Sequence, residues 1–383
     1  MKKFVFLSSM AFDANISIIK RLKEKYDIYF FTLLGERTSI GSIKLKKVIT
    51  NAADIPEFDK FSNFIDLSKS FVVRHKDSNF INKLLIDWKV YRQVIRINPE
   101  IIFVDSASIN YSLVRLLLHK KIFSIIHDPF LHSGEKTLSR KFSNFMLRKF
   151  STRYIMFNKK QSDDFAKLYN IPNYRIITSF LSQYEFLTLF DDKSTTLFKD
   201  KDFKILFWGR ISKYKGLRYL LDAINICSIR HVNDINVVIA GKGEFDFDIK
   251  FYKHLKNVIF INHFLETNEL VSLIKGADLV VCPYTDATQS GVIMSAYAFK
   301  KPVLATNVGG LPEMLCNGEL GMIVPPSDAQ SLAEAIMRLK KDKEKLMQYA
   351  ERIENTYFGN GNRSWKVSVN KIIHGIELFL SNK

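Results

Sequence analysis

One segment of the chain places glycines and cations in an order that could bind phosphate. A predicted strand at residues 204–208 leads directly into Gly209 and Arg210, and Lys215 and Gly216 precede a predicted helix. Glycine lets the backbone approach a ligand closely, and the first amides of a helix favour negative charge. Arg210 would offer a diphosphate its planar fork and Lys215 a point charge. This spacing alone is equally typical of a solvated basic turn.

Two later loops also follow predicted strands and could offer backbone amides to an anion. Gln289 or Ser290 stands near a helix start, with Gly291 in the first turn. Taken alone, this pattern more commonly indicates an N-capping serine with a packing glycine. Gly309 and Gly310 form a turn just before a proline at the next helix start. Three such loops in one half of the chain together favour a binding site.

The elements that would position these loops alternate between short apolar runs and segments of helical period. Runs that are continuously apolar indicate strands buried on both faces, and their alternation with helices indicates parallel sheets covered by helices. The predicted strands lie at residues 4–7, 28–31, 101–104, 122–126 and 154–157, and then at 204–208, 237–240, 258–261, 279–281 and 303–305. We therefore predict an α/β protein with two doubly wound, Rossmann-like domains.

The length of 383 residues also exceeds what one core usually organises. A polar stretch at 182–202 suits a linker. We predict a first domain at 1–185, a second domain at 200–362, and a helix at 363–383 that packs back on the first domain. Doubly wound sheets bind ligands at the carboxyl ends of their strands, so we expect the two domains to face each other across a cleft for two substrates.

Read in order, the loops resemble those of family 4 of the retaining glycosyltransferases with the GT-B fold. The matching blocks are GRISKYKG, then GKGE at 241–244, then the Gln-Ser-Gly loop, then KPVLATNVGGLPE at 301–313. The resemblance covers residues 203 to about 340 in the family's order and spacing. The first domain matches mainly through IHDPFLHSGE at 126–135, which is similar to one subgroup of the family.

The resemblance implies that the domain at 1–185 binds the acceptor and the domain at 200–362 binds the nucleotide-sugar. It also implies roles for individual residues. Arg210 and Lys215 would bind the donor diphosphate and stabilise charge on the leaving group without a metal. His127 would lie near the transferred sugar, where it could hydrogen-bond the donor or relay a proton, although a lone histidine at a strand end is more often structural. The residues implied for the donor site are Gly209, Arg210, Lys215, Gly241, Glu244, Gln289, Ser290, Gly291, Val292, Ile293, Ser295, Gly309 and Gly310.

The chain departs from the family pattern in two places. Many members carry a Glu-x7-Glu pair whose second carboxylate binds the ribose, and those positions hold Ala287 and Ser295 here. Ser295 could make a weaker hydrogen bond, and Gln289 could take over part of the sugar contact. The loop at residues 8–15 lacks the glycine pair that many members place against the phosphates. We therefore expect the donor to be held largely by its phosphates.

The charge of the chain indicates anionic partners. The net charge is +18, and residues 1–200 hold 33 Lys and Arg against 20 Asp and Glu. Nucleic acid, anionic lipid and phosphorylated small molecules would all be attracted. No aromatic and basic recognition motif supports nucleic acid. Residues 136–154 could form a basic amphipathic helix on an anionic membrane, where a lipid-linked acceptor resides, or a core-facing helix with a solvated basic face.

Metal, disulfide and membrane-spanning signals are weak. Cys227, Cys282 and Cys316 have no metal-ligand spacing and are expected to be reduced and cytosolic. The DxD sequence at 246–248 is the metal signature of the other large glycosyltransferase fold, but it follows GKGE, so we discount it. The first 11 residues superficially resemble a secretory signal, yet an amphipathic pattern follows as in a strand-helix unit. No apolar run of about 18 residues predicts a transmembrane helix.

From these features we predict an enzyme located in the cytoplasm, with the inner face of the cytoplasmic membrane as a second candidate location. It would transfer a hexose-type sugar from a UDP- or GDP-linked donor to a glycan or lipid-linked oligosaccharide, in surface polysaccharide biosynthesis. No cofactor or metal is expected besides the donor. One alternative is a nucleotide-sugar epimerase on the same fold. Another is a catalytically weak, transferase-like partner subunit, which Ala287 and Ser295 motivate.

Overall fold

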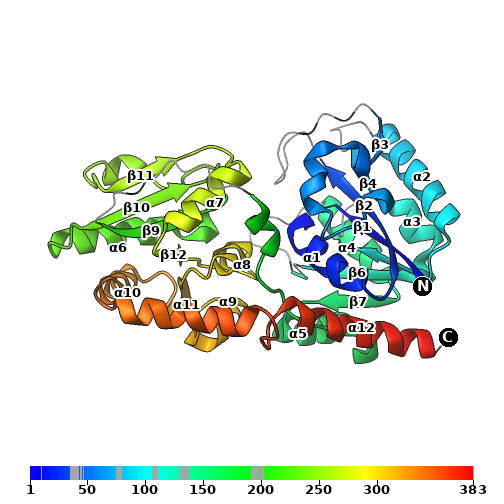
Figure 1. The fold of residues 1–383 in the computed structure, drawn as a ribbon. Coiled ribbons are helices and arrows are strands. Elements are labelled where there is room, and N and C mark those ends of the chain that lie inside the picture. The colour runs from blue at the N-terminus through cyan, green and yellow to red at the C-terminus, as the bar shows by residue number, and fades with distance from the viewer. Residues whose placement is uncertain are drawn as a thin grey trace. The chain divides into compact units, whose positions relative to one another are not determined.

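The chain forms two compact units in the computed structural model (Figure 1). The first contains Met1–Ser182 and Trp365–Lys383, and the second contains Gln183–Ser364. The structure describes residues 1–9, 11–34, 43, 45, 47–74, 80–105, 111–127, 129–130, 138–190, 198 and 202–382, without the side chains of residues 80 and 138–143.

The first unit is built on a largely parallel sheet. Its order is β3-β4-β2-β1-β5-β6-β7-β8, and among the described strands only the β3 and β4 pair is antiparallel. The chain order reverses between β1 and β5, which makes the carboxyl ends of these strands a switch point. The strands are β1 (Lys3–Ser8), β2 (Asp27–Leu34), β3 (Ile49–Asn51), β4 (Ser70–Arg74), β5 (Ile101–Val104), β6 (Ile122–Ile126), β7 (Arg153–Met156) and β8 (Ile176–Thr178).

Helices cover this sheet because each carries an apolar face at helical spacing. Val90 and Val94 of α2 pack against Val5, Ile102 and Val104 of the sheet, for example. The described helices of this part are α1 (Phe12–Leu22), α2 (Phe80–Ile97), α3 (Ser112–Leu117), α4 (Leu138–Lys149) and α5 (Lys159–Tyr169).

A buried carboxylate organises the switch point of the first unit. Asp105, directly after β5, accepts hydrogen bonds from the Ser8 hydroxyl (2.8 Å), the Ser9 amide (2.8 Å) and the Asn15 side-chain amide (2.6 Å). The loop at 8–15, which lacks the family's glycine pair, is therefore shaped by side-chain hydrogen bonds to one acceptor.

The second unit has a fully parallel sheet of order β11-β10-β9-β12-β13-β14. Its apolar core combines the 0% exposed residues Ile205, Val237 and Ile239 with α6 and α10, which pack against each other. The strands are β9 (Phe203–Trp208), β10 (Ile235–Ala240), β11 (Val258–Ile261), β12 (Leu279–Cys282), β13 (Val303–Thr306) and β14 (Gly321–Val324). The helices are α6 (Leu217–Ile229), α7 (Thr267–Gly276), α8 (Gly291–Ala298), α9 (Leu311–Met314), α10 (Ala329–Lys341) and α11 (Lys343–Tyr357).

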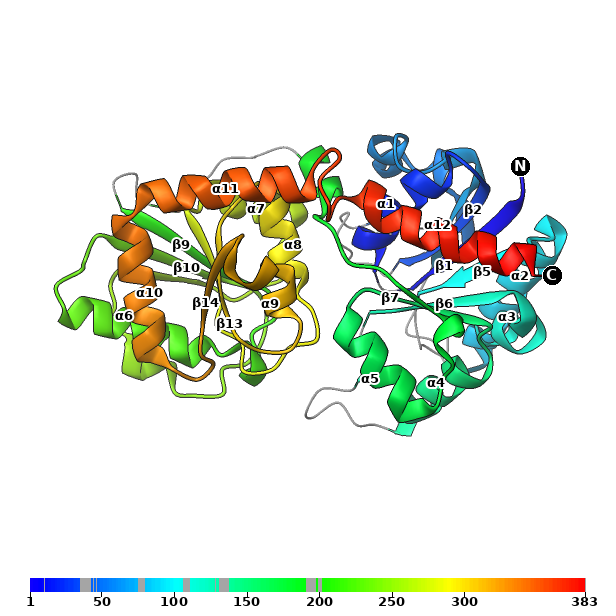
Figure 2. The same cartoon turned by 90° about the horizontal axis from the view of Figure 1, so that it is seen from below.

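The last helix, α12 (Trp365–Ser381), belongs to the first unit, where it packs against α1 and β8 (Figure 2). Val369, Ile372 and Ile376 are fully buried, so this helix is part of the first core. The units divide after Ser182 and after Ser364, whereas the sequence placed the first domain at 1–185, the second at 200–362 and the returning helix at 363–383.

The predicted linker at 182–202 needs a correction in its first part. Residues Glu185–Leu189 form a short 3-10 helix that packs against α7 and α8, and Phe186 and Leu187 are buried. The linker prediction rested on the polar run at 191–197, which lies outside the described residues, and it overlooked the apolar side chains before that run. No helix in the described part of the chain is long and apolar enough to cross a membrane.

Candidate functional site

The candidate donor loops follow neighbouring strands of the second sheet. Residues 209–216 follow β9, 241–244 follow β10, 283–290 follow β12 and 307–310 follow β13. The order of the sheet reverses between β9 and β12. Ligands of doubly wound sheets bind at the carboxyl ends of the strands at such a reversal. The topology therefore brings the predicted loops to one edge of one sheet.

Backbone hydrogen bonds join the β9 and β10 loops. The Gly209 amide donates to the Ala240 carbonyl at 2.9 Å, and the Ile211 amide donates to the Lys242 carbonyl at 3.1 Å. Ile211 also forms a parallel bridge with Gly243. The two loops thus extend the pairing of their strands, and the exposed Arg210 is carried on a fixed backbone.

The β9 and β12 loops meet at Gly216. Its φ of +65° suits glycine, and a Cβ atom there would lie 1.9 Å from the Pro283 carbonyl oxygen. The Thr285 amide donates to the Tyr214 carbonyl at 2.8 Å. The second glycine of GRISKYKG therefore permits contact between two loops, a role beyond helix initiation.

Tyr284 positions Lys215, and the sequence analysis did not single it out. The Lys215 ammonium lies 3.8 Å from the centre of the Tyr284 ring, a cation–π contact. The Tyr284 hydroxyl lies 3.3 Å from the Ser290 hydroxyl, and burial raises the pKa of this phenol well above its ordinary value. A tyrosine directly after a predicted strand, beside a loop that carries a lysine, was the available signal.

The start of α8 presents amides and an unsatisfied side chain. Ser290 is the N-cap residue but makes no capping hydrogen bond, so it leaves the first-turn amides of Gly291, Val292 and Ile293 without a side-chain cap. Helix starts of this kind attract anions. Both polar atoms of the Gln289 amide are buried and have no hydrogen-bond partner among the residues that the structure describes. Such groups are normally paired, which points to a ligand or water at this position.

The β13 loop joins the same surface through Gly309. A Cβ atom there would lie 1.5 Å from the Ala287 carbonyl oxygen, and φ is +52°. The Gly310 amide donates to the Thr288 carbonyl at 3.1 Å. Only glycine permits this approach, because both the space and the backbone conformation exclude a side chain.

The environment of Ser295 differs from the one that the resemblance implied. It is buried, and its hydroxyl donates to the Gly291 carbonyl at 2.8 Å, one turn earlier in α8. The hydroxyl therefore already donates its one hydrogen bond within the helix. Toward a ribose it could only accept a hydrogen bond. Ala287 is buried as well. Glu244 is exposed at the β10 loop, and Gly241 at its start donates its amide to the Ile261 carbonyl at 2.8 Å.

His127 lies in the first unit, directly after β6, and stacks on Phe157 with ring centres 5.3 Å apart. Asp128 and the HSGE residues at 132–135 lie outside the described residues. The predicted basic helix at 136–154 is shorter, as α4; its Leu147 packs into a core cluster while Phe145 is exposed. Its contact with a membrane stays a prediction.

Asp248 of the discounted DxD sequence has a local structural role. Its carboxylate accepts a hydrogen bond from the Lys250 amide at 2.9 Å and caps the short 3-10 helix Ile249–Tyr252. Capping of this kind commonly accounts for an aspartate at such a position.

Comparison with known proteins finds a family model that matches most of the second unit. Residues 190–356 match the family model described as "Glycosyl transferases group 1". The alpha-D-kanosaminyltransferase of Streptomyces kanamyceticus is 29% identical over 150 residues, which is 38% of this chain and 39% of that protein. The capsular polysaccharide biosynthesis glycosyltransferase CapM of Staphylococcus aureus is 29% identical over 157 residues, 40% of each chain. The chain thus spans about two fifths of the length of these relatives.

The fold is also that of solved structures. The Anabaena protein Alr3699/HepE, crystallised in complex with UDP, superposes with a TM-score of 0.65 at 17% identity, covering 100% of both chains. This similarity confirms the GT-B fold and its two α/β domains with parallel sheets.

Proposed function

We propose that the chain transfers a hexose-type sugar from a nucleoside-diphosphate sugar to an acceptor hydroxyl with retention at the anomeric carbon, and the match of residues 190–356 to the family model described as "Glycosyl transferases group 1" supports this. In this reaction the bond between the anomeric carbon and the diphosphate oxygen breaks. The acceptor oxygen bonds to that carbon on the same face, and the hydroxyl proton leaves with the diphosphate. The second unit would act mainly on the leaving group.

The observation that carries the proposal is the joined set of loops after β9, β12 and β13. They combine the cations Arg210 and Lys215 with the uncapped start of α8. Positive charge and amides that are already oriented stabilise a departing diphosphate without reorganising during the reaction. With Ala287 and Ser295 at the positions of the family carboxylates, binding through the phosphates would dominate.

For the donor and acceptor we propose a UDP-sugar or GDP-sugar and a glycan or lipid-linked oligosaccharide of a surface polysaccharide. The relative named for capsular polysaccharide biosynthesis and the similar structure crystallised with UDP support this choice. We further propose a cytoplasmic enzyme that acts near the membrane. No metal would be needed, because the two cations take its place at the diphosphate. Chelation with EDTA should therefore leave the rate unchanged.

The test begins with a screen of UDP-, GDP- and ADP-sugars for thermal stabilisation, since a ligand that binds only the folded state raises apparent stability. Turnover of the selected donor is then compared for the wild type, the double variant Arg210→Ala/Lys215→Ala and the control Lys213→Ala. Lys213 is an exposed cation in the same loop. We expect the double variant to lose about 100-fold or more in rate, as oxyanion-type groups do, and the control to stay near wild type.

Equal turnover in the folded double variant and the wild type would refute this phosphate site. Analysis of the sugar without any acceptor separates the alternatives. A UDP-sugar converted to an epimer would indicate the epimerase. Absence of any nucleotide-sugar binding by calorimetry would indicate the partner subunit.

A further inference from the structure

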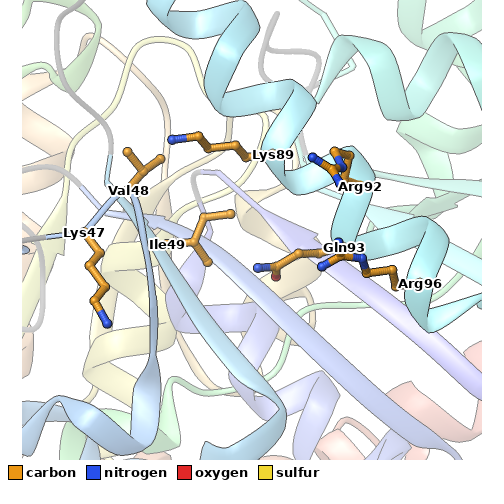
Figure 3. Close-up of a pocket in the computed structure, with 7 residues that line it drawn as sticks. All are labelled: Lys47, Val48, Ile49, Lys89, Arg92, Gln93 and Arg96. Atoms are coloured by element: carbon orange, nitrogen blue, oxygen red, sulfur yellow. The ribbon is translucent and has the colours of Figure 1, made fainter.

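The first unit contains a basic pocket that the proposed function does not use. The pocket has a volume of about 330 Å³ and lies between α2 and the segment that leads into β3 (Figure 3). Lys89, Arg92, Gln93 and Arg96 line it from the helix, and Lys47, Val48 and Ile49 line it from the opposite side. This volume lies at the small end of the range for ligand sites.

The described part of the chain offers the cations of this pocket no acidic partner. None of the ion pairs found among the described residues involves Lys47, Lys89, Arg92 or Arg96, and no carboxylate lines the cavity. Four like charges repel one another unless an anion lies among them. The one uncharged polar group in the lining, the Gln93 amide, can donate to an anion as well.

Helical spacing divides α2 into three stripes. Positions 90 and 94 are fully buried in the core of the first unit. Positions 89, 92, 93 and 96 face the pocket. A third stripe, next to the cations, exposes large apolar side chains: Ile81 (66%), Leu85 (54%), Trp88 (48%) and Ile95 (46%). Residues three, four and seven apart lie on one face of a helix, so the apolar stripe runs beside the cationic one, and Arg92 lies between Trp88 and Ile95 at the border of the two.

An exposed apolar stripe beside a cationic one fits an interface between lipid and water. Tryptophan and aliphatic side chains enter the boundary of headgroups and acyl chains, while lysine and arginine meet phosphates. A free phosphate would use the cations alone and leave the apolar stripe in water. A protein partner would need acidic and apolar surfaces in matching order, whereas an anionic membrane supplies both layers.

We propose that α2 and the pocket form a membrane-docking site in which the phosphate of an anionic lipid headgroup enters the cavity lined by Lys47, Lys89, Arg92 and Arg96. The apolar stripe around Trp88 enters the interfacial layer. This site is distinct from α4, and it does not depend on sugar transfer.

The test measures binding to vesicles of phosphatidylcholine alone and of phosphatidylcholine with phosphatidylglycerol, by sedimentation at low and at high salt. The charge variant is Lys47→Gln/Lys89→Gln. Its matched control is Lys160→Gln/Lys167→Gln, which removes two exposed lysines from α5 in the same unit. We expect the wild type to bind only the anionic vesicles, the charge variant to bind roughly 25-fold more weakly, and the control to stay within about twofold of wild type.

The apolar stripe is tested with Trp88→Ser against Leu168→Ser, which removes an exposed apolar side chain (61%) from α5. We expect weaker vesicle binding only for Trp88→Ser, and a blue shift of wild-type tryptophan fluorescence with anionic vesicles that this variant loses. Circular dichroism and melting curves verify that every variant is folded.

Equal binding of the wild type to both vesicle types would overturn the proposal, as would equal losses in the charge variant and its control. If inorganic pyrophosphate stabilises the wild type but not the charge variant while vesicles do not bind, the pocket takes a dissolved phosphate compound and the lipid assignment is wrong.

Discussion

The ring of Tyr284 fixes where the Lys215 charge lies, because the ammonium is 3.8 Å from its centre. Replacing the ring by an aliphatic side chain, Tyr284→Leu, should therefore weaken UDP binding by roughly 3- to 30-fold, the range of a cation–π contact. Tyr284→Phe keeps the ring and loses only the contact with Ser290, so it should bind UDP nearly as the wild type does. Isothermal calorimetry measures both affinities. Equal affinities of the two variants would show that the ring does not position Lys215.

At the switch point of the first unit, the Asp105 carboxylate accepts five hydrogen bonds whose atoms are at least partly buried. The donors are the hydroxyls of Ser8 and Ser9, the amides of Ser9 and Ala11, and the side-chain amide of Asn15. Asp105→Asn places a donor where one acceptor was, and so leaves at least one of these groups unpaired. Each such loss costs about 1–3 kcal/mol. We expect the free energy of unfolding to fall by about 2–4 kcal/mol in urea denaturation. Asp54 is an exposed carboxylate for which no side-chain hydrogen bond or ion pair is found among the described residues. Asp54→Asn should therefore change the free energy of unfolding by less than about 0.5 kcal/mol.

At the scale of elements, one helix caps another. Asp87 of α2 is buried and accepts from the Leu113 amide at 2.8 Å, at the start of α3. Burial is the largest cause that raises the pKa of this carboxyl to about 6. The folded state then holds the proton between about pH 4 and pH 6 while the unfolded state has lost it. Stability contributed by the neutral form should therefore fall as the pH rises through this window.

The variant Asp87→Asn tests whether stability falls as the pH rises, because its side-chain amide still accepts from the Leu113 amide and cannot ionise. At pH 7–8 it should be more stable than the wild type by about 1–3 kcal/mol, and the gain should vanish below about pH 4. Urea denaturation across this pH range measures it. A loss of stability at pH 7 would instead mean that the charged carboxylate is favoured by the helix start.

The central strands could be predicted from the sequence, whereas three of the four edge strands among the described residues could not. Runs such as residues 101–104 are apolar throughout because both faces are covered. The strands that we missed, β3, β4, β8 and β14, lie at the edges of the sheets or next to them. They are only 3 to 5 residues long and partly exposed, and their apolar runs have at most three residues. The edge strand β11, which was predicted, has an apolar run of four residues. A strand at an edge is defined by its partner, which a local pattern does not contain.

Part of the candidate site could likewise be predicted from the sequence, and part could not. Gly216 and Gly309 could be found because each loop needs a residue without a side chain. The role of Tyr284 and the internal hydrogen bond of Ser295 depend on which loops the sheet order brings together. That order follows from pairing across 70 residues or more, for example between β9 and β12, which no local motif specifies.

At the scale of the whole molecule, the first unit is completed by the last residues of the chain. The α12 helix contributes the buried Val369, Ile372 and Ile376, and the hydroxyls of Ser179 and Ser368 lie 2.8 Å apart. A fragment of residues 1–182 leaves this apolar surface uncovered, at a cost of about 1.5–3 kcal/mol for each exposed side chain. We expect it to aggregate or melt broadly, whereas a fusion of 1–182 to 365–383 through a Gly/Ser linker should melt cooperatively. Equal melting of both would show that α12 is dispensable.

The second unit, in contrast, contains its whole sheet and all four donor loops within residues 183–364. Expressed alone, this fragment should fold, because neither its α6 and α10 core nor its hydrogen-bonded loops need residues from the first unit.

If the phosphates provide most of the binding energy of the donor, the fragment should bind UDP within about fivefold of the full chain. It should transfer no sugar, because it lacks His127 and the predicted acceptor domain. Calorimetry with UDP measures the first expectation and a product assay the second. The fragment carrying Arg210→Ala/Lys215→Ala is the control and should lose UDP binding. A folded fragment that does not bind UDP would mean that the first unit supplies essential donor contacts, and the phosphate clamp would then be insufficient by itself.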